Sequence, residues 1–477
     1  MEFQRGTDVR TEGAPPLNSS RARFALFGGS VACALAFEEP ISSATLRSVG
    51  RDVAVSAPGD GRTLFFELET DTDYYLNVDG KWFYFFVDLP PQTPTDVLEI
   101  QPRDALGDVG AVQRFVDYAT RQGKTLVFAA GEFLTAPLRL RSKASLYLSA
   151  GAVLRFGGVA DDDSDDDDDA ATKSFLNLTD CSNCRIAGPG ALDPAPFFGK
   201  AVYLSKASDV SITDVTIRSS RHWAVHVHQS RRVSLDRVKI FSGCDGVDPD
   251  SSAGVDVHRC FIHAWDDAVA VKATSAPTSD VSVRRSVVST RKSALKIGTE
   301  TLGNISNVTF SDVDVFAAGR GAAMYAKDGG AVAGVTFERL RMFDFYAYAG
   351  ESAAELGRVF DFELQIRGGD ASAFRGVSVD DVYAEVSAPA VLKGDNSTNL
   401  STVSLRNVVF DVVDGGPVFN SSRFLFDCHN GDIATDGVAV ENLTVRWNRR
   451  RIDWRGISAA HPGYTPPAHT FSLCDAA

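Results

Sequence analysis

The chain has 477 residues, enough to bury a large core and to hold a second, smaller domain. Its net charge of −14 excludes the dense basic surface that a nucleic-acid partner requires. No run of 18 or more apolar residues occurs, which excludes a membrane-spanning helix of ordinary length. The 40 glycines and only 3 methionines favour β-structure with many turns over helical bundles.

The N-terminal region alternates apolar and polar residues around turns such as "APGDGR" and "NVDGK". We expect residues 1–17 to be disordered or processed and residues 18–88 to form a small β-sandwich. The stretch from Arg21 to Phe37 fits either a signal peptide or two core strands joined by a turn at Gly28 and Gly29. We favour the strands, because a signal normally begins closer to the first residue.

A Pro-rich linker is expected over residues 89–103, and a second domain over residues 104–477. The second domain opens with "DALGDVGAVQRFVDYATRQGKT", an amphipathic pattern that predicts a helix ending near Gly123. This helix would cover the apolar end of the repeats that follow it, as the terminal units of repeat proteins do.

A repeat of the form V-x-h-x-x-h-x-h, where h is apolar, fixes the architecture of this domain. It begins at Val210, Val233, Val255, Val281, Val308, Val335, Val377, Val403 and Val438. Each unit indicates two short strands around a polar corner, and period-2 alternation excludes a helical solenoid. The early spacing of 22 to 27 residues is too short for a propeller blade. The sequence therefore predicts an all-β chain whose main domain is a right-handed, single-stranded parallel β-helix.

Two other features bear on metals and on compartment. The acidic run Asp161–Asp169, within a loop insertion at 160–172, is interpreted as a solvated loop, since calcium loops space their carboxylates with Gly and Asn. Cys181 and Cys184 have CxxC spacing without a second pair, so no metal site or cofactor is predicted. Eight Asn-x-Ser/Thr sequons favour an extracellular or secretory-pathway protein, expected to be a monomer.

Stacking the coils aligns their inward residues as Val225, Val247, Val269, Leu295 and Met324. The adjacent outward columns then contain His226, Asp248, Ala270, Lys296 and Tyr325, and beyond them His228, Asp250, Lys272, Gly298 and Lys327.

In this register Asp245 lies one coil from Asp267, with Asp266 beside them. Both Asp245 and Asp267 share the parity of the inward valines, so either they are buried, at a cost, or a bend turns them outward. We expect the bend.

Three carboxylates gathered in this way raise the pKa of at least one of them, because like charges oppose joint ionisation. One carboxylic acid beside two carboxylates is what an inverting glycosidase uses, the acid for the leaving oxygen and a base for water. An exposed acidic ladder or a cation site is the alternative.

The phrase "CDGVDPDSS…CFIHAWDDAVAVK", with "IAGPGALD" and "SSRHWAVHV", resembles glycoside hydrolase family 28, the polygalacturonases. The resemblance covers roughly residues 104–445 and implies that Asp266 is the general acid, while Asp245 and Asp267 hold and activate the water. It also implies hydrolysis of α-galacturonide linkages in pectin.

The sequence departs from the family's motifs at several positions. "SGCDG" stands for NTDG and "WDDA" for GDDC, Ser293 stands where the family has the His of GHG, and Tyr325 replaces the Arg of RIK while Lys327 keeps its Lys. These departures leave the acid–base core intact and put the identity of the substrate in doubt.

Substrate-binding residues are predicted around the three aspartates. They are the cationic Lys272, Lys296 and Lys327, which would attract uronate carboxylates, together with Tyr325, His226, Asp248 and Trp265. Ordinary surface lysines are the alternative for the cations. Trp223 would either form the base of a sugar-binding subsite or pack between coils.

Two other functions remain open. The N-terminal phrase "YYLNVDGKWFYFFV" is similar to the sandwich that precedes the dextranase and isopullulanase type of β-helix glycanase, so another polysaccharide is the first alternative. A catalytically weakened polysaccharide-binding protein is the second, while a lyase is disfavoured because this face shows Asp where β-elimination needs a strong base.

Overall fold

The computed structural model describes most of the chain. The described residues are 2–5, 19–25, 29–158, 173–345, 357–364, 367, 372–386, 390–393, 401–412, 426–427, 438–441, 444–447 and 450–452. They divide between two compact units, residues 1–95 and residues 96–477. The acidic run Asp161–Asp169 lies outside the described residues. Where the structure is described, no helix is both long enough and apolar enough to cross a membrane.

The first unit contains two sheets that share one apolar core. The six-stranded sheet has the spatial order β1 (Glu2–Arg5), β2 (Ser19–Ala25), β9 (Lys81–Asp88), β8 (Thr72–Val78), β4 (Ala44–Ser48) and β5 (Arg51–Val53). The other sheet has the order β3 (Ser30–Ala36), β7 (Thr63–Glu69) and β6 (Val55–Ser56). Strict alternation along β7 buries Leu64, Phe66 and Leu68 in that core.

The strand interpretation of the segment from Arg21 to Phe37 is confirmed, because β2 and β3 occupy it. Two boundaries differ from those expected. Residues 2–5, expected to be disordered or processed, form β1 and pair with β2. Residues 97–100, expected within the linker, form β10 and pair in parallel with the second unit.

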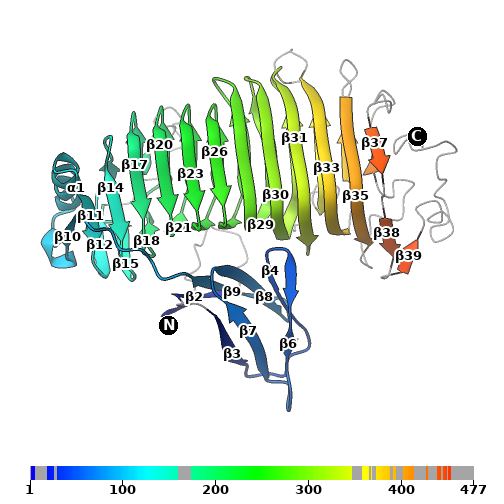
Figure 1. Ribbon diagram of the computed structural model, residues 1–477, viewed down its shortest axis with the longest axis horizontal. Coiled ribbons are helices and arrows are strands. Elements are labelled where there is room, and N and C mark those ends of the chain that lie inside the picture. Colours follow the sequence, from blue (N-terminus) through cyan, green and yellow to red (C-terminus); the bar gives the residue numbers. More distant parts are fainter. Residues whose placement is uncertain are drawn as a thin grey trace. The chain divides into compact units, whose positions relative to one another are not determined.

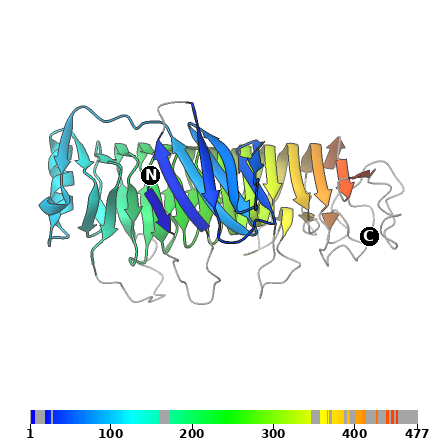
Figure 2. The ribbon, with the colours of Figure 1, turned by 90° about the horizontal axis from the view of Figure 1, so that it is seen from below.

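The second unit is a parallel β-helix, as predicted, and its coils follow one another in sequence order (Figures 1 and 2). Its early coils contribute strands to three rows. The first row contains β10 (Val97–Ile100), β11 (Thr125–Phe128), β14 (Ser145–Leu148), β17 (Ser182–Ala187), β20 (Ser208–Thr213), β23 (Arg231–Asp236) and β26 (Ala253–His258). The second contains β12 (Gly131–Thr135), β15 (Ala152–Phe156), β18 (Ala191–Asp193), β21 (Thr216–Ser220), β24 (Lys239–Ser242) and β27 (Phe261–Ala264). The third contains β13 (Leu138–Arg139), β16 (Ser174–Thr179), β19 (Lys200–Ser205), β22 (Val225–His228), β25 (Val247–Asp250) and β28 (Val269–Ala273).

From Thr278 onward the strands of a coil often run together. The later strands are β29 (Thr278–Thr301), β30 (Ile305–Ala326), β31 (Ala331–Phe343), β32 (Arg358–Leu364), β33 (Ala373–Val386), β34 (Ala390–Lys393), β35 (Ser401–Val412), β36 (Phe426–Asp427), β37 (Val438–Glu441), β38 (Thr444–Trp447) and β39 (Arg450–Ile452). All pair in parallel except β38 with β39.

A short 3₁₀ helix, η1 (Pro102–Ala105), and helix α1 (Ala111–Arg121) precede the early coils. The apolar face of α1 buries Val112 and Val116 in the same core as the coils, as a cap does. Gly123, at a φ of 68°, ends the helix where the sequence predicted.

The nine predicted repeats stack in a single register, each first valine pairing with the next from Val210 to Val438. The fifth residue of each of the first eight repeats has a φ between 50° and 65°, so it forms the corner between two strands. At these corners Arg237 bonds Asp214 and Arg339 bonds Asp312 one coil earlier.

Two details of the second unit complete its description. Cys181 and Cys184 form a disulfide, so the CxxC pair is covalently closed rather than a pair of free thiols. The predicted column Val225–Val247–Val269–Leu295 is confirmed, but Leu295 pairs with Ala322 and not with Met324. The coil that contains β30 is therefore displaced by two residues from the predicted register. The displacement keeps Met324 and Ala326 inward and moves Tyr325 away from Lys296 along the sheet.

Candidate active site

Two bends place the three aspartates at the entry to the third row of strands. Residues 243–246 connect β24 to β25 and carry Asp245, and residues 265–268 connect β27 to β28 and carry Asp266 and Asp267. Gly246 permits this close stacking, because a Cβ there would lie 2.4 Å from the carbonyl oxygen of Ala268. The bends were predicted. The expected exposure of both carboxylates is wrong, since Asp245 and Asp267 are each only 4% exposed.

Buried lysines explain how these carboxylates are accommodated. The Nζ of Lys272 lies 3.1 Å from Oδ2 of Asp245 and 3.0 Å from Oδ1 of Asp248, and Lys272 is itself buried. Burial alone would lower the pKa of Lys272, but Asp248 and Asp245 raise it above its ordinary value, so Lys272 stays charged. Asp248, fully buried and outside hydrogen-bond geometry with any described partner, has its pKa raised by desolvation.

Asp267 is held as an anion in a similar way. Its Oδ1 accepts a hydrogen bond from the backbone N–H of Ser293 at 3.0 Å, and its Oδ2 accepts one from Nζ of Lys296. Burial opposes ionisation of Asp267, but the charge and hydrogen bond of Lys296 lower its pKa below the ordinary value. Ser293, which replaces the family's histidine, thus contributes through its backbone.

The pKa of Asp266 is shifted in the opposite direction to that of Asp267. It is partly exposed, and burial and then the charges of Asp267 and Asp245 raise its pKa to about 6, against the opposing charges of Lys296 and Lys292. Carboxyl oxygens of Asp266 and Asp245 lie within 4.8 Å of each other and of the sulfur of Cys244. That separation is shorter than the 6.5–9.5 Å or so expected between acid and base of an inverting enzyme.

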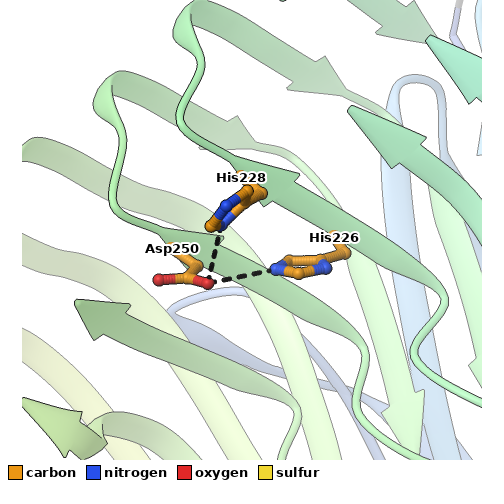
Figure 3. Close-up of side chains that lie close together, drawn as sticks. All are labelled: His226, His228 and Asp250. Carbon is orange, nitrogen blue, oxygen red and sulfur yellow. Dashed lines mark hydrogen bonds and ion pairs between the residues drawn. The ribbon is translucent and has the colours of Figure 1, made fainter. Parts of the chain in front are cut away.

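A second polar cluster lies on the same face, on β22 and β25. His226 Nε2 and His228 Nδ1 both point at Oδ2 of Asp250, at 3.3 and 3.0 Å (Figure 3). Thr274 adds bonds from its backbone N–H and its hydroxyl. Burial opposes ionisation of Asp250, yet the hydrogen bonds from the two histidines and Thr274 lower its pKa, while desolvation lowers the pKa of His226 to about 4. These donors suit a transition metal such as Zn²⁺ in type, but Asp250 already has a full set of protein partners.

The predicted aromatic residues stack on cations. Lys272 Nζ lies 3.7 Å from the ring centroid of Trp223, and Lys200 Nζ lies 5.4 Å from the same ring. Trp265 is covered by the guanidinium of Arg291 at 3.8 Å. Trp223 therefore lies beside cations that belong to other coils, Lys200 and Lys272.

Tyr325 and Lys327 lie further along the coil stack. The Tyr325 hydroxyl donates to Oδ2 of Asp361 at 2.7 Å, and that carboxylate also pairs with Arg320 and Arg358. Nζ atoms of Lys296 and Lys327 lie 5.8 and 5.7 Å from the Tyr325 ring. Both lysines therefore lie close to the Tyr325 ring.

Lys200, Arg320 and Asp361 were not predicted. Lys200 was detectable, because it precedes Val202 as Trp223 precedes Val225, which places it one coil before Trp223. Arg320 and Asp361 were not, since their contacts depend on the displaced register and on an insertion between β31 and β32.

Acid and base groups on the outer face of a parallel β-helix, beside cations and tryptophan, are the groups that an enzyme acting on carbohydrate would use. Residues 193–349 match the family "Glycosyl hydrolases family 28". The matched span contains all three aspartates.

Several known proteins are similar to this chain in sequence or in fold. A Vitis vinifera protein named "Probable polygalacturonase" is 27% identical over 43% of this chain, and the match spans half of its own length. A hyperthermoactive exopolygalacturonase from Thermotoga maritima has the same fold, with a TM-score of 0.56 at 17% identity over 76% of this chain and 94% of its own. Dex49A from Penicillium minioluteum matches over 96% of this chain and 83% of its own, with a TM-score of 0.58 at 14% identity.

Proposed function

We propose that this enzyme hydrolyses α-galacturonide linkages of pectin with inversion, using Asp266 as the general acid. The observation that carries the proposal is that two adjacent aspartates have pKa values shifted in opposite directions. The pKa of Asp266 is raised to about 6, whereas Lys296 lowers the pKa of Asp267. Near pH 5 one side chain can donate a proton while its neighbour is ionised, which is the pairing that glycoside hydrolysis needs.

In the proposed reaction the protonated carboxyl of Asp266 gives its proton to the glycosidic oxygen as the bond to the anomeric carbon breaks. A water held by Asp245 and Asp267 attacks that carbon from the opposite face and loses its proton to one of them. Lys272 and Lys296 keep these two carboxylates in position through the contacts described above.

A uronate substrate is favoured by the cations that border the aspartates. Lys327 is partly exposed, so its ammonium group can bind a sugar carboxylate. The extracellular or secretory location and the monomeric state remain part of the same proposal, consistent with a polymer found outside the cell.

The experiment is to incubate the protein separately with polygalacturonate and dextran and to measure new reducing ends. Proton NMR during early turnover then gives the anomeric configuration of the first product. The proposal requires cleavage of polygalacturonate with inversion. Retention would reassign Asp245 as a nucleophile, which its short separation from Asp266 makes a meaningful test. Binding without cleavage of either polymer would identify a polysaccharide-binding protein.

A further inference from the structure

The cluster of His226, His228 and Asp250 has no part in the proposed reaction (Figure 3). The two histidines lie on β22, and the aspartate lies on β25, one coil later. One nitrogen of each ring and a carboxylate oxygen all lie within 4.8 Å of one another. Imidazole nitrogen and carboxylate oxygen are both common Zn²⁺ ligands, and three protein ligands with one open position are typical of zinc sites that also bind water. The cluster therefore has the donor types and the number of donors of such a site.

The spacing of the donor atoms also fits a tetrahedral ion. Zn²⁺ bonds of about 2.0–2.1 Å place two ligand atoms of a tetrahedron about 3.3 Å apart. Oδ2 of Asp250 lies 3.3 Å from Nε2 of His226 and 3.0 Å from Nδ1 of His228. Both contacts of Oδ2 are therefore already close to the spacing that such an ion imposes.

The two oxygens of Asp250 have different partners. Oδ1 accepts hydrogen bonds from the Ser251 hydroxyl at 2.8 Å and from the backbone N–H of Thr274 at 2.9 Å. The Thr274 hydroxyl lies 2.9 Å from Oδ1 and 2.7 Å from Oδ2, so it can bond either oxygen. Metal-binding carboxylates are typically oriented by outer hydrogen bonds of this kind. An ion on Oδ2 would replace the contacts with the two imidazoles and leave the bonds of Oδ1 in place.

His226 provides a second, independent observation. It is only 7% exposed, its Nδ1 has no hydrogen-bond partner among the described residues, and its Nε2 makes only the long contact with Asp250. Asp250 is offered five donors, from His226, His228, the Ser251 hydroxyl, and the N–H and hydroxyl of Thr274. A carboxylate has about four lone-pair sites, so one donor is in excess. A buried side chain with so little hydrogen bonding is costly, and an ion bound through its lone pair explains its presence.

We infer that His226, His228 and Asp250 form a binding site for a divalent transition-metal ion, Zn²⁺ in the first place, with water in the fourth position. The inference goes beyond the proposed function and does not depend on the substrate. The ion would join β22 to β25 across one coil, so its binding should stabilise the folded protein. Ca²⁺ and Mg²⁺ should not replace it, because they prefer ligand sets made of oxygen.

The test is a titration of the protein, without a histidine tag, with Zn²⁺ by calorimetry and with Co²⁺ by visible absorption, which reports tetrahedral coordination. His228→Gln removes a ligand whose ring is partly exposed. His258→Gln is the matched control, since His258 also faces an aspartate, Asp236 at 3.2 Å, but lies on the first row.

We expect the wild type to bind one Zn²⁺ per cluster and to unfold at a higher temperature when the ion is present. His228→Gln should weaken Zn²⁺ binding at least about 100-fold and Ser251→Ala about tenfold, since outer hydrogen bonds typically contribute 10- to 100-fold. Lys200→Met should strengthen binding, because the charge of Lys200 acts on His226 and opposes a cation there. His258→Gln should behave as the wild type.

The inference is overturned if the wild type does not bind Zn²⁺, or if His228→Gln binds it as tightly as the wild type. Cys244, Asp245 and Asp266 form another group of possible ligands, so Cys244→Ser is measured as well. Loss of binding in Cys244→Ser, with binding retained in His228→Gln, would place the ion at the aspartates and also overturn the inference.

Two further features keep the test decisive. Should His228→Gln fail to fold, Ser251→Ala and Lys200→Met must still change the affinity in opposite directions, and equal affinities would overturn the site. Zn²⁺ binding is measured without substrate, so failure to cleave polygalacturonate would count against the proposed function alone.

Discussion

The backbone N–H of Asp267 donates a hydrogen bond to Oδ1 of Asp245, 3.1 Å away, across one coil of the β-helix. Because the donor belongs to the main chain, the carboxylate of Asp245 is fixed by the coil stacking itself. The same coil that supplies this donor presents Asp266, so the positions of the proposed acid and of the two carboxylates proposed to bind water depend on a single pair of bends.

Asp266→Asn should reduce turnover about 10²-fold or more, the range associated with losing a general acid, while substrate binding persists. The amide keeps the shape but has no acidic proton to give. Turnover is measured as reducing-end release and binding by calorimetry. Asp381→Asn is the control, since Asp381 is exposed and its left-handed backbone accommodates Asn. Undiminished turnover by Asp266→Asn would remove the assignment of the acid.

The pH dependence of kcat/KM should be bell-shaped. Asp266 is active when protonated, so the rate should fall as pH rises through about 6. Asp267 is active when ionised, so the rate should also fall at low pH, below the ordinary pKa of an aspartate because Lys296 lowers its value.

Lys296→Met should shift the whole profile to higher pH. The lysine lowers the pKa of both Asp267 and Asp266, so its removal raises both. Lys206→Met, which changes an exposed lysine, should leave the profile in place. Opposite movement of the two limbs would contradict the proposed roles.

Asp250→Asn should destabilise the fold by about 3 kcal/mol at pH 7, because it removes a buried anion that accepts hydrogen bonds from His226, His228 and Thr274. The pKa of Asp250 is lowered in the folded protein, so its contribution is present above the unfolded-state pKa of about 3.9 and is lost as pH falls below it. Denaturant unfolding of both proteins at several pH values should show the difference shrinking in acid. A constant difference would mean that Asp250 is not ionised in the folded state.

Gly246→Ala should lower both stability and activity. The added Cβ would meet the carbonyl oxygen of Ala268 at 2.4 Å and Cγ2 of Ile262 at 2.6 Å, and the backbone must move to relieve the contact. A cost of about 1–3 kcal/mol is typical of overpacking, and the displaced bend carries Asp245 with it. Thermal unfolding and kcat measure the two effects. Normal kcat at reduced stability would show that Asp245 tolerates displacement.

Much of this arrangement could be predicted because a β-helix repeats its inward residues. The columns through Val225, Val247 and Val269 follow from spacing alone, and they bring Asp245 next to Asp267. The displacement at Met324 could not be predicted, because a shift by two residues leaves every side chain on its own face. The alternation of apolar and polar residues is the same in both registers.

The burial of Asp245 and Asp267 was also beyond the pattern. The alternation of residues along the strand allowed two placements for these carboxylates, in the apolar interior or on an exposed bend. The structure has a third, in which Lys272 and Lys296 cover the carboxylates outside the core. Those lysines were predicted to bind substrate directly. Whether a side chain neutralises a neighbour or a ligand depends on distances of a few ångströms, which spacing in a sequence does not give.

The register between repeats survives large differences in the length of a coil. Val335 and Val377 are 42 residues apart and Val403 and Val438 are 35 apart, yet each pair stacks as directly as Val233 and Val255, which are 22 apart. The extra chain therefore lies between repeats, from the end of β31 to β33 and from the end of β35 to β37, and leaves the pairing of these strands unchanged. In an evolving lineage, the segments between repeats can change in length and sequence while the strands next to the three aspartates keep their register.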